Sequence, residues 1–175
     1  MAFLIIAEII FLLVATWLVV GFFNIIFRGF APLVASRKRA IDLVLNTIKP
    51  QPKQTIYELG SGSARFLQMV EKKFSGVKLV GIEYSVAPFL IFSAFLYLKQ
   101  STIKIRLQNM FRANLQDADF IYCYLLPSMM PRLGEKIRTE CKRGAILISY
   151  MFSVPGWEPK QIIKQGSDTI YFYEV

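Results

Sequence analysis

The chain has 175 residues, 54% of them hydrophobic, and its 21 Lys and Arg residues against 12 Asp and Glu give a net charge of +9. It has no histidine and two cysteines, Cys123 and Cys141, which form no CxxC pair. These counts exclude serine or cysteine catalysis with a histidine base, histidine-ligated metal sites and a disulfide scaffold. The high apolar content excludes a disordered chain.

The apolar residues are concentrated at the N-terminus. Residues 3–27 contain one charged residue, Glu8, and about 20 apolar residues suffice to cross a bilayer as a helix. A cleaved signal peptide would need basic residues before a shorter apolar core, with small residues at its end. Residues 1–7 contain no Lys or Arg, and bulky Phe and Ile residues fill the end of the run. We therefore expect residues 1–27 to form a retained transmembrane anchor.

Basic residues follow this run and none precedes it: Arg28, Arg37, Lys38 and Arg39. The positive-inside rule then places the C-terminal domain of a single-pass membrane protein on the cytoplasmic side. Removing residues 1–27 takes away one acid and no base, so the remainder carries a net charge of +10. Such a domain suits an anionic membrane surface, nucleic acid or an acidic protein. Next to an anchor, lipid headgroups are the simplest explanation.

After the anchor, short β-prone runs alternate with helical runs. Residues 28–52 are expected to form a basic connector and an N-terminal helix over 37–47, capped by Ser36 and ended by prolines. Residues 53–175 form the main domain. In chain order its predicted elements are a strand at 55–59, a helix at 64–74, a strand at 77–82, a helix at 87–98, strands at 103–107 and 120–126, a helix at 128–140, a strand at 145–150, and β-prone runs at 161–164 and 169–175.

This alternation predicts a parallel sheet covered on both faces. The last two runs flank Gly166, Ser167 and Asp168, which is typical of a hairpin. The predicted fold is therefore α/β, with a Rossmann-like doubly wound sheet. It has five parallel strands and a C-terminal antiparallel hairpin, and one transmembrane helix precedes it.

The most informative segment is the first predicted strand with its turn, which reads Tyr-Glu-Leu-Gly-Ser-Gly at 57–62. A strand with an acid near its end leads into a glycine turn that opens a helix, and glycines there let the backbone approach a ligand. The dinucleotide fingerprint needs a third glycine where Arg65 stands. The pattern acid-x-Gly-x-Gly-x-small is instead the form used for S-adenosylmethionine.

Two polar residues follow the next strands. Glu83 lies 23 positions after Gly60, where a carboxylate can accept bonds from both ribose hydroxyls of a nucleoside. Asn109 follows the third strand and can bond the edge of adenine, with Met110 or Phe111 against its face. A role for Asn109 as a turn residue is an equal alternative.

The segments after the fourth and fifth strands line the same edge of the sheet and contain Pro127, Phe152 and Trp157. Aromatic residues there could surround a lysine ammonium by cation–π contact. They could equally cover the end of the sheet, and the sequence favours neither reading.

Taken together, these motifs resemble the membrane-anchored class I lysine methyltransferases. That family includes the mitochondrial enzymes for the ATP synthase c-ring protein and for adenine nucleotide translocase, with small prokaryotic relatives. Ser63 and Ala64 stand where the family usually has Asp and Gly, and Asn109 stands where it usually has Asp. The matching segments are the N-terminal span with its basic flank, Ala31-Pro32-Leu33-Val34, residues 57–62 with Arg65, residues 81–83, residues 126–130, and residues 152–155 with Trp157 and Pro159.

The resemblance implies S-adenosylmethionine as cofactor, N-methylation of lysine on a membrane-associated protein, and no metal. Without histidine we expect transfer by alignment of the reactants, and we assign no catalytic residue. The expected cofactor-binding residues are Glu58, Gly60, Ser61, Gly62, Glu83, Tyr84, Asn109 and Met110, and the substrate-pocket candidates are Pro127, Phe152 and Trp157.

Other functions remain open. One is methylation of RNA or DNA, which the basic domain favours. The Asn/Asp-Pro-Pro-aromatic motif of nucleic-acid N-methylases is replaced here by Leu126-Pro127-Ser128, so a nucleic-acid partner is disfavoured. A small-molecule or lipid methyltransferase is another alternative. A catalytically degenerate, membrane-tethered binding module is the third.

Overall fold

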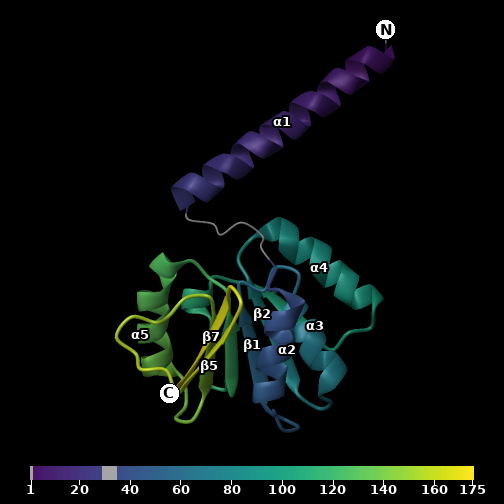
Figure 1. Ribbon diagram of the computed structural model, residues 1–175. Helices are drawn as coiled ribbons and strands as arrows, with labels where there is room; N and C mark the ends of the chain where they lie inside the picture. The colour runs from purple at the N-terminus through teal and green to yellow at the C-terminus, as the bar shows by residue number, and fades with distance from the viewer. Residues whose placement is uncertain (1, 29–34) are drawn as a thin grey trace. The chain divides into compact units, whose positions relative to one another are not determined.

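The computed structural model describes the backbone of residues 2–28 and 35–175, and the side chains of residues 5–21 and 35–175 (Figure 1). The chain divides into two compact units, residues 1–34 and residues 35–175. The Ala31-Pro32-Leu33-Val34 motif and most of the expected connector lie outside the described residues.

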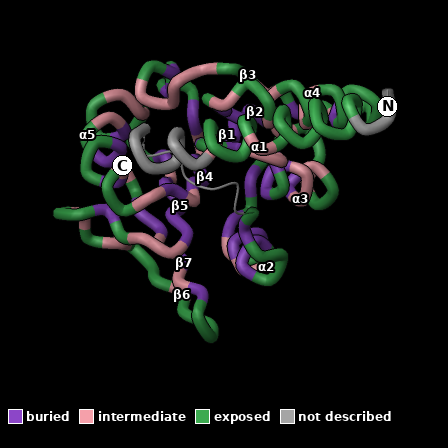
Figure 2. Tube along the Cα trace, turned by 90° about the horizontal axis from the view of Figure 1, so that it is seen from above, coloured by how far each residue is buried: buried purple, intermediate pink, exposed green. Residues whose placement is uncertain are grey.

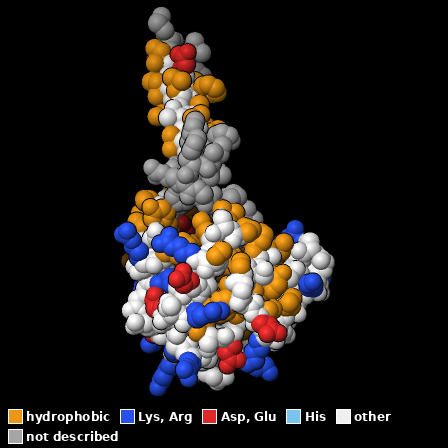
Figure 3. Space-filling model, turned by 90° about the vertical axis from the view of Figure 1, so that its left-hand side faces the viewer, with side chains coloured by type: hydrophobic (Ala, Val, Ile, Leu, Met, Phe, Trp, Pro, Cys, Tyr) orange, Lys and Arg blue, Asp and Glu red, His pale blue; other side chains and the backbone are white. Residues whose placement is uncertain are grey.

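The first unit contains helix α1, Ala2–Arg28. Its described side chains are nearly all apolar and exposed, and Glu8 is the one acid among them (Figure 3). Within residues 5–21 and 35–175, whose side chains the structure describes, no helical segment is both long enough and apolar enough to cross a bilayer. The transmembrane anchor at residues 1–27 stays a prediction.

The second unit is built on one mixed sheet with the strand order β3-β2-β1-β4-β5-β7-β6. The first five strands run parallel, and β7 pairs antiparallel with both β5 and β6. The predicted α/β fold with a C-terminal antiparallel hairpin is confirmed. The strands are β1 (Thr55–Leu59), β2 (Lys78–Glu83), β3 (Lys104–Leu107), β4 (Phe120–Cys123), β5 (Ile146–Tyr150), β6 (Gln161–Gln165) and β7 (Asp168–Glu174).

Two apolar clusters cover the faces of this sheet. Because successive strand residues point to opposite faces, Ile56 packs with α2 and α3, whereas Tyr57 packs with α5 on the other side. All five β1 residues are buried, as expected for a central parallel strand, and Figure 2 shows this part of the molecule as buried. The helices are α2 (Lys38–Thr47), α3 (Arg65–Lys73), α4 (Val86–Leu98) and α5 (Met130–Glu140), with 3₁₀ turns η1 (Met110–Arg112) and η2 (Pro127–Met129).

Two local expectations were wrong. Ser36 does not cap α2, because its Oγ accepts a hydrogen bond of 2.6 Å from the buried Tyr122 hydroxyl and Arg37 takes the cap position. A buried hydroxyl needs such a partner. The helix predicted at 128–140 begins as the separate turn η2, and α5 starts at Met130 with Pro131 in its first turn, where a missing N–H is tolerated.

Candidate active site

The glycine turn between β1 and α3 has a left-handed backbone. Gly60 has φ +68° and Gly62 has φ +48°. A Cβ on Gly60 would lie 3.1 Å from Leu125 Cδ2, so the turn approaches the segment that follows β4. Ala64 holds φ 52°, where a non-glycine residue costs roughly 1–2 kcal/mol. The turn thus keeps its shape although alanine replaces the usual glycine.

Glu83, at the end of β2, faces this turn. Its Oε2 accepts the Gly62 N–H at 2.7 Å, and its Oε1 accepts the Ser85 N–H at 2.8 Å. Each carboxylate oxygen has two lone-pair positions, so both can accept a further bond. Gly81 in the same strand makes room for the turn, because a Cβ there would lie 2.8 Å from Ser61 Oγ. This fixed carboxylate beside bare glycine backbone fits the ribose of a nucleoside.

Glu58 supports the turn from beneath. It is buried, and its Oε2 accepts the Leu67 N–H at 3.2 Å. Ala64, at the N-cap of α3, supplies no side-chain bond, so Glu58 provides the acceptor that the first turn of a helix needs. Burial, reinforced by the Glu83 charge, raises the pKa of Glu58 to about 8, although backbone N–H bonds from Leu67 and Phe66 oppose this shift.

The end of β3 adjoins the same edge. The Gln108 N–H donates to the Glu83 carbonyl at 2.8 Å, which ties the two strand ends together. Asn109 Oδ1 accepts the Phe111 N–H at 2.9 Å and caps η1, so its amide nitrogen is the group that could reach a purine acceptor. Met110 is half-buried, and Tyr84 is exposed.

Three aromatic rings gather where β4 and β5 end. The centroid of Tyr124 lies 4.6 Å from that of Tyr150 and 6.5 Å from that of Phe152. Ser149 Oγ donates to the Phe152 carbonyl at 2.6 Å, and Met151 between them has φ 74°. Strained backbone of this kind clusters at functional sites. Among the expected pocket residues, Phe152 belongs to this aromatic cluster.

The other two pocket candidates lie differently. Pro127 is exposed at the start of η2. Trp157 packs edge-on against Tyr173 at 5.8 Å, with the Arg138 guanidinium 4.8 Å from its ring centroid. A Cβ on Gly134 of α5 would lie 3.2 Å from Trp157 Nε1. These contacts fit the alternative in which Trp157 covers the sheet.

Sequence reasoning missed a hydrogen-bond network beside the aromatic cluster, which runs from the buried Tyr150 and Asp168 to the exposed Arg37 and Ser167. Asp168 Oδ1 accepts the Tyr150 hydroxyl at 2.6 Å and Arg37 Nη1 at 3.3 Å, and Arg37 also donates to Ser167 Oγ at 2.7 Å. Burial, and then the Asp168 carboxylate, raises the pKa of Tyr150 above its ordinary value, so its hydroxyl remains protonated at neutral pH. No local signal could reveal this network, because Arg37 and Asp168 lie 131 positions apart.

The two cysteines and the acidic side chains provide neither an activated thiol nor a metal site among the described residues. Burial raises the pKa of Cys123 to about 12 and that of Cys141 to about 11, so both remain thiols, and a thiol is a poor nucleophile. Within residues 5–21 and 35–175, no group of three or more Cys, Asp and Glu side chains is placed to hold a metal ion.

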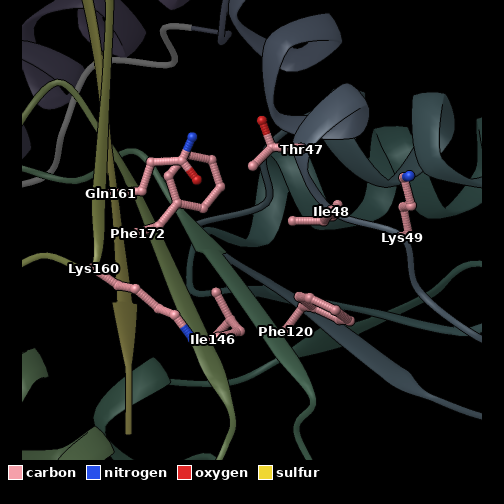
Figure 4. A pocket seen from close by; sticks show the side chains of 8 residues that line it. All are labelled: Thr47, Ile48, Lys49, Phe120, Ile146, Lys160, Gln161 and Phe172. Atoms are coloured by element: carbon pink, nitrogen blue, oxygen red, sulfur yellow. The ribbon is translucent and has the colours of Figure 1, made fainter.

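A separate groove of about 410 Å³ lies at the end of the sheet where the parallel strands begin (Figure 4). Phe120 and Ile146 in its wall begin β4 and β5, whereas ligands of open parallel sheets bind where the strands end. This groove is therefore not the cofactor site. Its lining residues are Thr47, Ile48, Lys49, Phe120, Ile146, Lys160, Gln161 and Phe172.

A seven-stranded sheet of this order, with a glycine turn after β1 and a carboxylate at the end of β2, defines a class I methyltransferase that uses S-adenosylmethionine. Residues 58–161, more than half of the chain, match the ANTKMT methyltransferase domain. The chain belongs to that family.

Two proteins of similar sequence are named as lysine N-methyltransferases. The mouse adenine nucleotide translocase lysine N-methyltransferase is 24% identical, over 89% of this chain and 68% of that protein. A protein-lysine N-methyltransferase of Saccharolobus islandicus is 26% identical, over 82% of this chain and 93% of that protein.

Solved structures confirm the fold. An RNA methyltransferase from Salinibacter ruber, in complex with S-adenosyl-L-homocysteine, superposes with a TM-score of 0.74 at 23% identity, over 81% of this chain and 93% of that one. A precorrin-6y C5,15-methyltransferase from Geobacter metallireducens gives a TM-score of 0.67 at 9% identity, over 83% and 91%. At these identities the likeness concerns the fold alone.

Proposed function

We propose that this chain methylates the ε-amino nitrogen of lysine on a membrane-associated protein. The observation that carries the proposal is the aromatic cluster of Tyr124, Tyr150 and Phe152, because the segment after Tyr124 contacts the glycine turn at Gly60. Rings of this kind bind an alkylammonium group by cation–π contact. The lysine N-methyltransferases among the relatives support the same substrate class.

When bound, S-adenosylmethionine supplies an electrophilic methyl group on a sulfonium. The protein holds the nucleoside at Glu83 and the glycine turn, and orients the lysine amine at the aromatic cluster. Presenting a lysine of pKa ~10.4 as the neutral amine at pH 7 costs about 4.6 kcal/mol, and an apolar pocket lowers that cost. The chain contains no histidine, so the amine proton leaves to water, to a carboxylate or to a tyrosinate. Alignment of the reactants contributes up to about 7–11 kcal/mol.

The test is incubation of the chain with methyl-labelled S-adenosylmethionine and native membranes, with cytosol and RNA from the same cells in parallel. A labelled membrane protein whose label maps to lysine supports the proposal. Label in RNA or lipid instead would contradict it. Absence of label together with no cofactor-induced rise in Tm would favour a degenerate binding module.

We also propose that residues 1–27 anchor the chain in a membrane as a single span, with residues 35–175 on the cytoplasmic side. The proposal rests on the apolar sequence of 3–27, the helical backbone of α1 and the basic residues that follow it. Alkaline carbonate extraction and protease protection test it. Release of the full chain into the soluble fraction would contradict the anchor, and protection of the catalytic unit would contradict the orientation.

A further inference from the structure

Helix α4 presents an apolar surface that the rest of residues 35–175 leaves uncovered. Its 13 residues, Val86–Leu98, include no charged side chain, and Leu96 alone among them is buried. Ile91 is 62% exposed, Tyr97 83% and Leu98 81%. Figure 2 shows most of the helix as exposed. A surface helix of a soluble domain instead has a polar outer face.

The polarity of α4 is inverted. At about 3.6 residues per turn, its exposed large side chains fall on the outward half of the helix. Ser93 is the one serine in the helix. Its Oγ is buried and has no hydrogen-bond partner among the described residues. The helix therefore buries its serine hydroxyl and exposes most of its large apolar side chains. The outward residues are Val86, Leu90, Ile91, Phe95, Tyr97 and Leu98.

Exposed apolar side chains of residues 35–175 gather in this one region. Of their nine exposed large hydrophobic side chains, eight lie between Tyr84 and Leu107, and Ile162 is the exception. Leu107, 46% exposed, extends the patch onto β3 at the edge of the sheet. Contiguous apolar patches of this kind mark interaction sites, whereas scattered single residues do not.

The segment that carries the patch has charges of one sign, and the carboxylates beside its two ends are bonded to it, Glu83 to Ser85 and Glu71 to Thr102. The 33 residues from 84 to 116 contain Lys99, Lys104, Arg106 and Arg112 and no acid. Lys99 Nζ lies 4.2 Å from the ring centroid of Phe95, so the ammonium sits at the end of the apolar helix. By contrast, Figure 3 shows Lys and Arg mixed with Asp and Glu on the face that carries α5. An occupant of the α4 patch that suits these side chains is apolar, with negative charge near Lys99.

We propose that α4 and the adjoining strand β3 lie in the headgroup region of an anionic lipid bilayer. Such a surface offers an apolar interior for Ile91 and Leu98 and negative headgroups for Lys99, the combination that characterises interfacial helices. Tyr97 suits the boundary between the two layers. A second copy of the chain would bring like charges together, and nucleic acid would leave the apolar half of α4 unused.

One end of this surface adjoins the cofactor site. The Ser85 N–H donates to Glu83 Oε1 at 2.8 Å, and α4 begins at the next residue. A bilayer against α4 thus holds the edge that binds the cofactor close to the membrane. The inference does not rest on the identity of the methylated substrate or on the anchor at residues 1–27.

The test uses the full chain with Cys141→Ser, which removes the half-buried thiol and leaves the buried Cys123. An environment-sensitive NBD label is attached to Ile91→Cys or, as the matched control, to Lys164→Cys. Lys164 is exposed on β6, at the opposite edge of the sheet from β3. Both variants retain α1, so a difference between them reports on α4 itself.

With vesicles of phosphatidylcholine and phosphatidylglycerol, the label at 91 should shift to the blue and lose fluorescence when doxyl-labelled lipids are included. The label at 164 should do neither. Equal water exposure at both positions overturns the proposal, whether or not the chain sediments with the vesicles. A blue shift at 91 that grows with protein concentration and is not quenched by doxyl lipids identifies a second copy instead. Equal quenching with phosphatidylcholine alone overturns the requirement for anionic lipid.

Discussion

The Gly62 N–H donates to Glu83 Oε2 at 2.7 Å. This bond joins the turn after β1 to the end of β2 and holds the two halves of the nucleoside site in register. Because Ser85 fixes the other oxygen, the carboxylate is oriented before any ligand binds. Preorganisation of this kind reduces the entropy lost on binding.

Replacing Glu83 by Ala should weaken cofactor binding about 100-fold or more. Two hydrogen bonds to a charged group contribute roughly 1.5–3 kcal/mol each, and about 2.8 kcal/mol corresponds to that factor. Isothermal titration with S-adenosylmethionine measures the change, and circular dichroism checks that the domain is folded. Glu135→Ala, which removes an exposed acid, is the control and should bind as the parent does. Equal affinity for Glu83→Ala and the parent would remove Glu83 from the site.

Glu58 makes the stability of the fold depend on pH. Its folded-state pKa of about 8 lies above the ordinary 4.5, so between these values the folded state binds the proton more tightly than the unfolded chain. The stability contribution is fully present below the lower value and is lost as pH rises toward the upper one. Tm should therefore fall between about pH 5 and pH 8.5 in the parent.

Glu58→Gln keeps an oxygen for the Leu67 N–H but cannot ionise. Its Tm should fall less over the same pH range, as measured by thermal unfolding in parallel with the parent. Identical pH profiles for the two proteins would show that Glu58 does not titrate in this window.

The fold could be predicted where local sequence decides it. The β-prone run at 55–59 forms β1 with the same bounds, because its β-branched and aromatic residues suit a central strand that is buried on both faces. The glycine turn and Glu83 could be associated from spacing alone, since parallel strands end at one edge. Their direct bond could not be predicted, because spacing does not give the direction of a side chain.

Contacts between distant segments could not be predicted from the sequence. Ser36 has the composition of a helix cap, yet its hydroxyl serves Tyr122, 86 positions away. Residues 87–98 read as an apolar helix, and this pattern alone cannot say that most of its side chains are exposed. Hydrophobicity identifies the side chains that favour burial and does not identify what covers them.

Phe152→Leu should impair methyl transfer while cofactor affinity stays the same. Leucine preserves apolar contact with Tyr124 but removes the ring to which the proposed function assigns the lysine ammonium, and cation–π contacts contribute about 0.5–2 kcal/mol. We expect kcat/KM for the labelled membrane substrate to fall roughly 2- to 30-fold. Phe152→Tyr keeps the ring and should retain most of the rate. A loss as large in Phe152→Tyr as in Phe152→Leu would argue for packing instead of cation–π binding.

The buried pair of Tyr150 and Asp168 should be energetically coupled. Tyr150→Phe deprives the carboxylate of its 2.6 Å donor, and Asp168→Asn weakens the link to Arg37. Each single change should destabilise the fold by about 1–3 kcal/mol. In urea unfolding, the double variant should be less destabilised than the two singles combined, with a coupling of about 0.5–3 kcal/mol. Strict additivity would mean that the bond contributes nothing to stability.

Gly134 has no side chain because α5 approaches the loop after β5. A Cβ there would lie 2.5 Å from Val154 Cγ1, and Val154 is 2% exposed and held by the Tyr173 hydroxyl. Gly134→Ala should destabilise the domain by about 1–3 kcal/mol through overpacking, although alanine favours a helix by about 1 kcal/mol.

Adding Val154→Ala removes the methyl groups that clash, so the double variant should recover part of the stability that Gly134→Ala loses. Urea unfolding of the parent, both singles and the double variant measures this coupling. If Gly134→Ala proved as stable as the parent, the close packing of α5 against Val154 would be refuted.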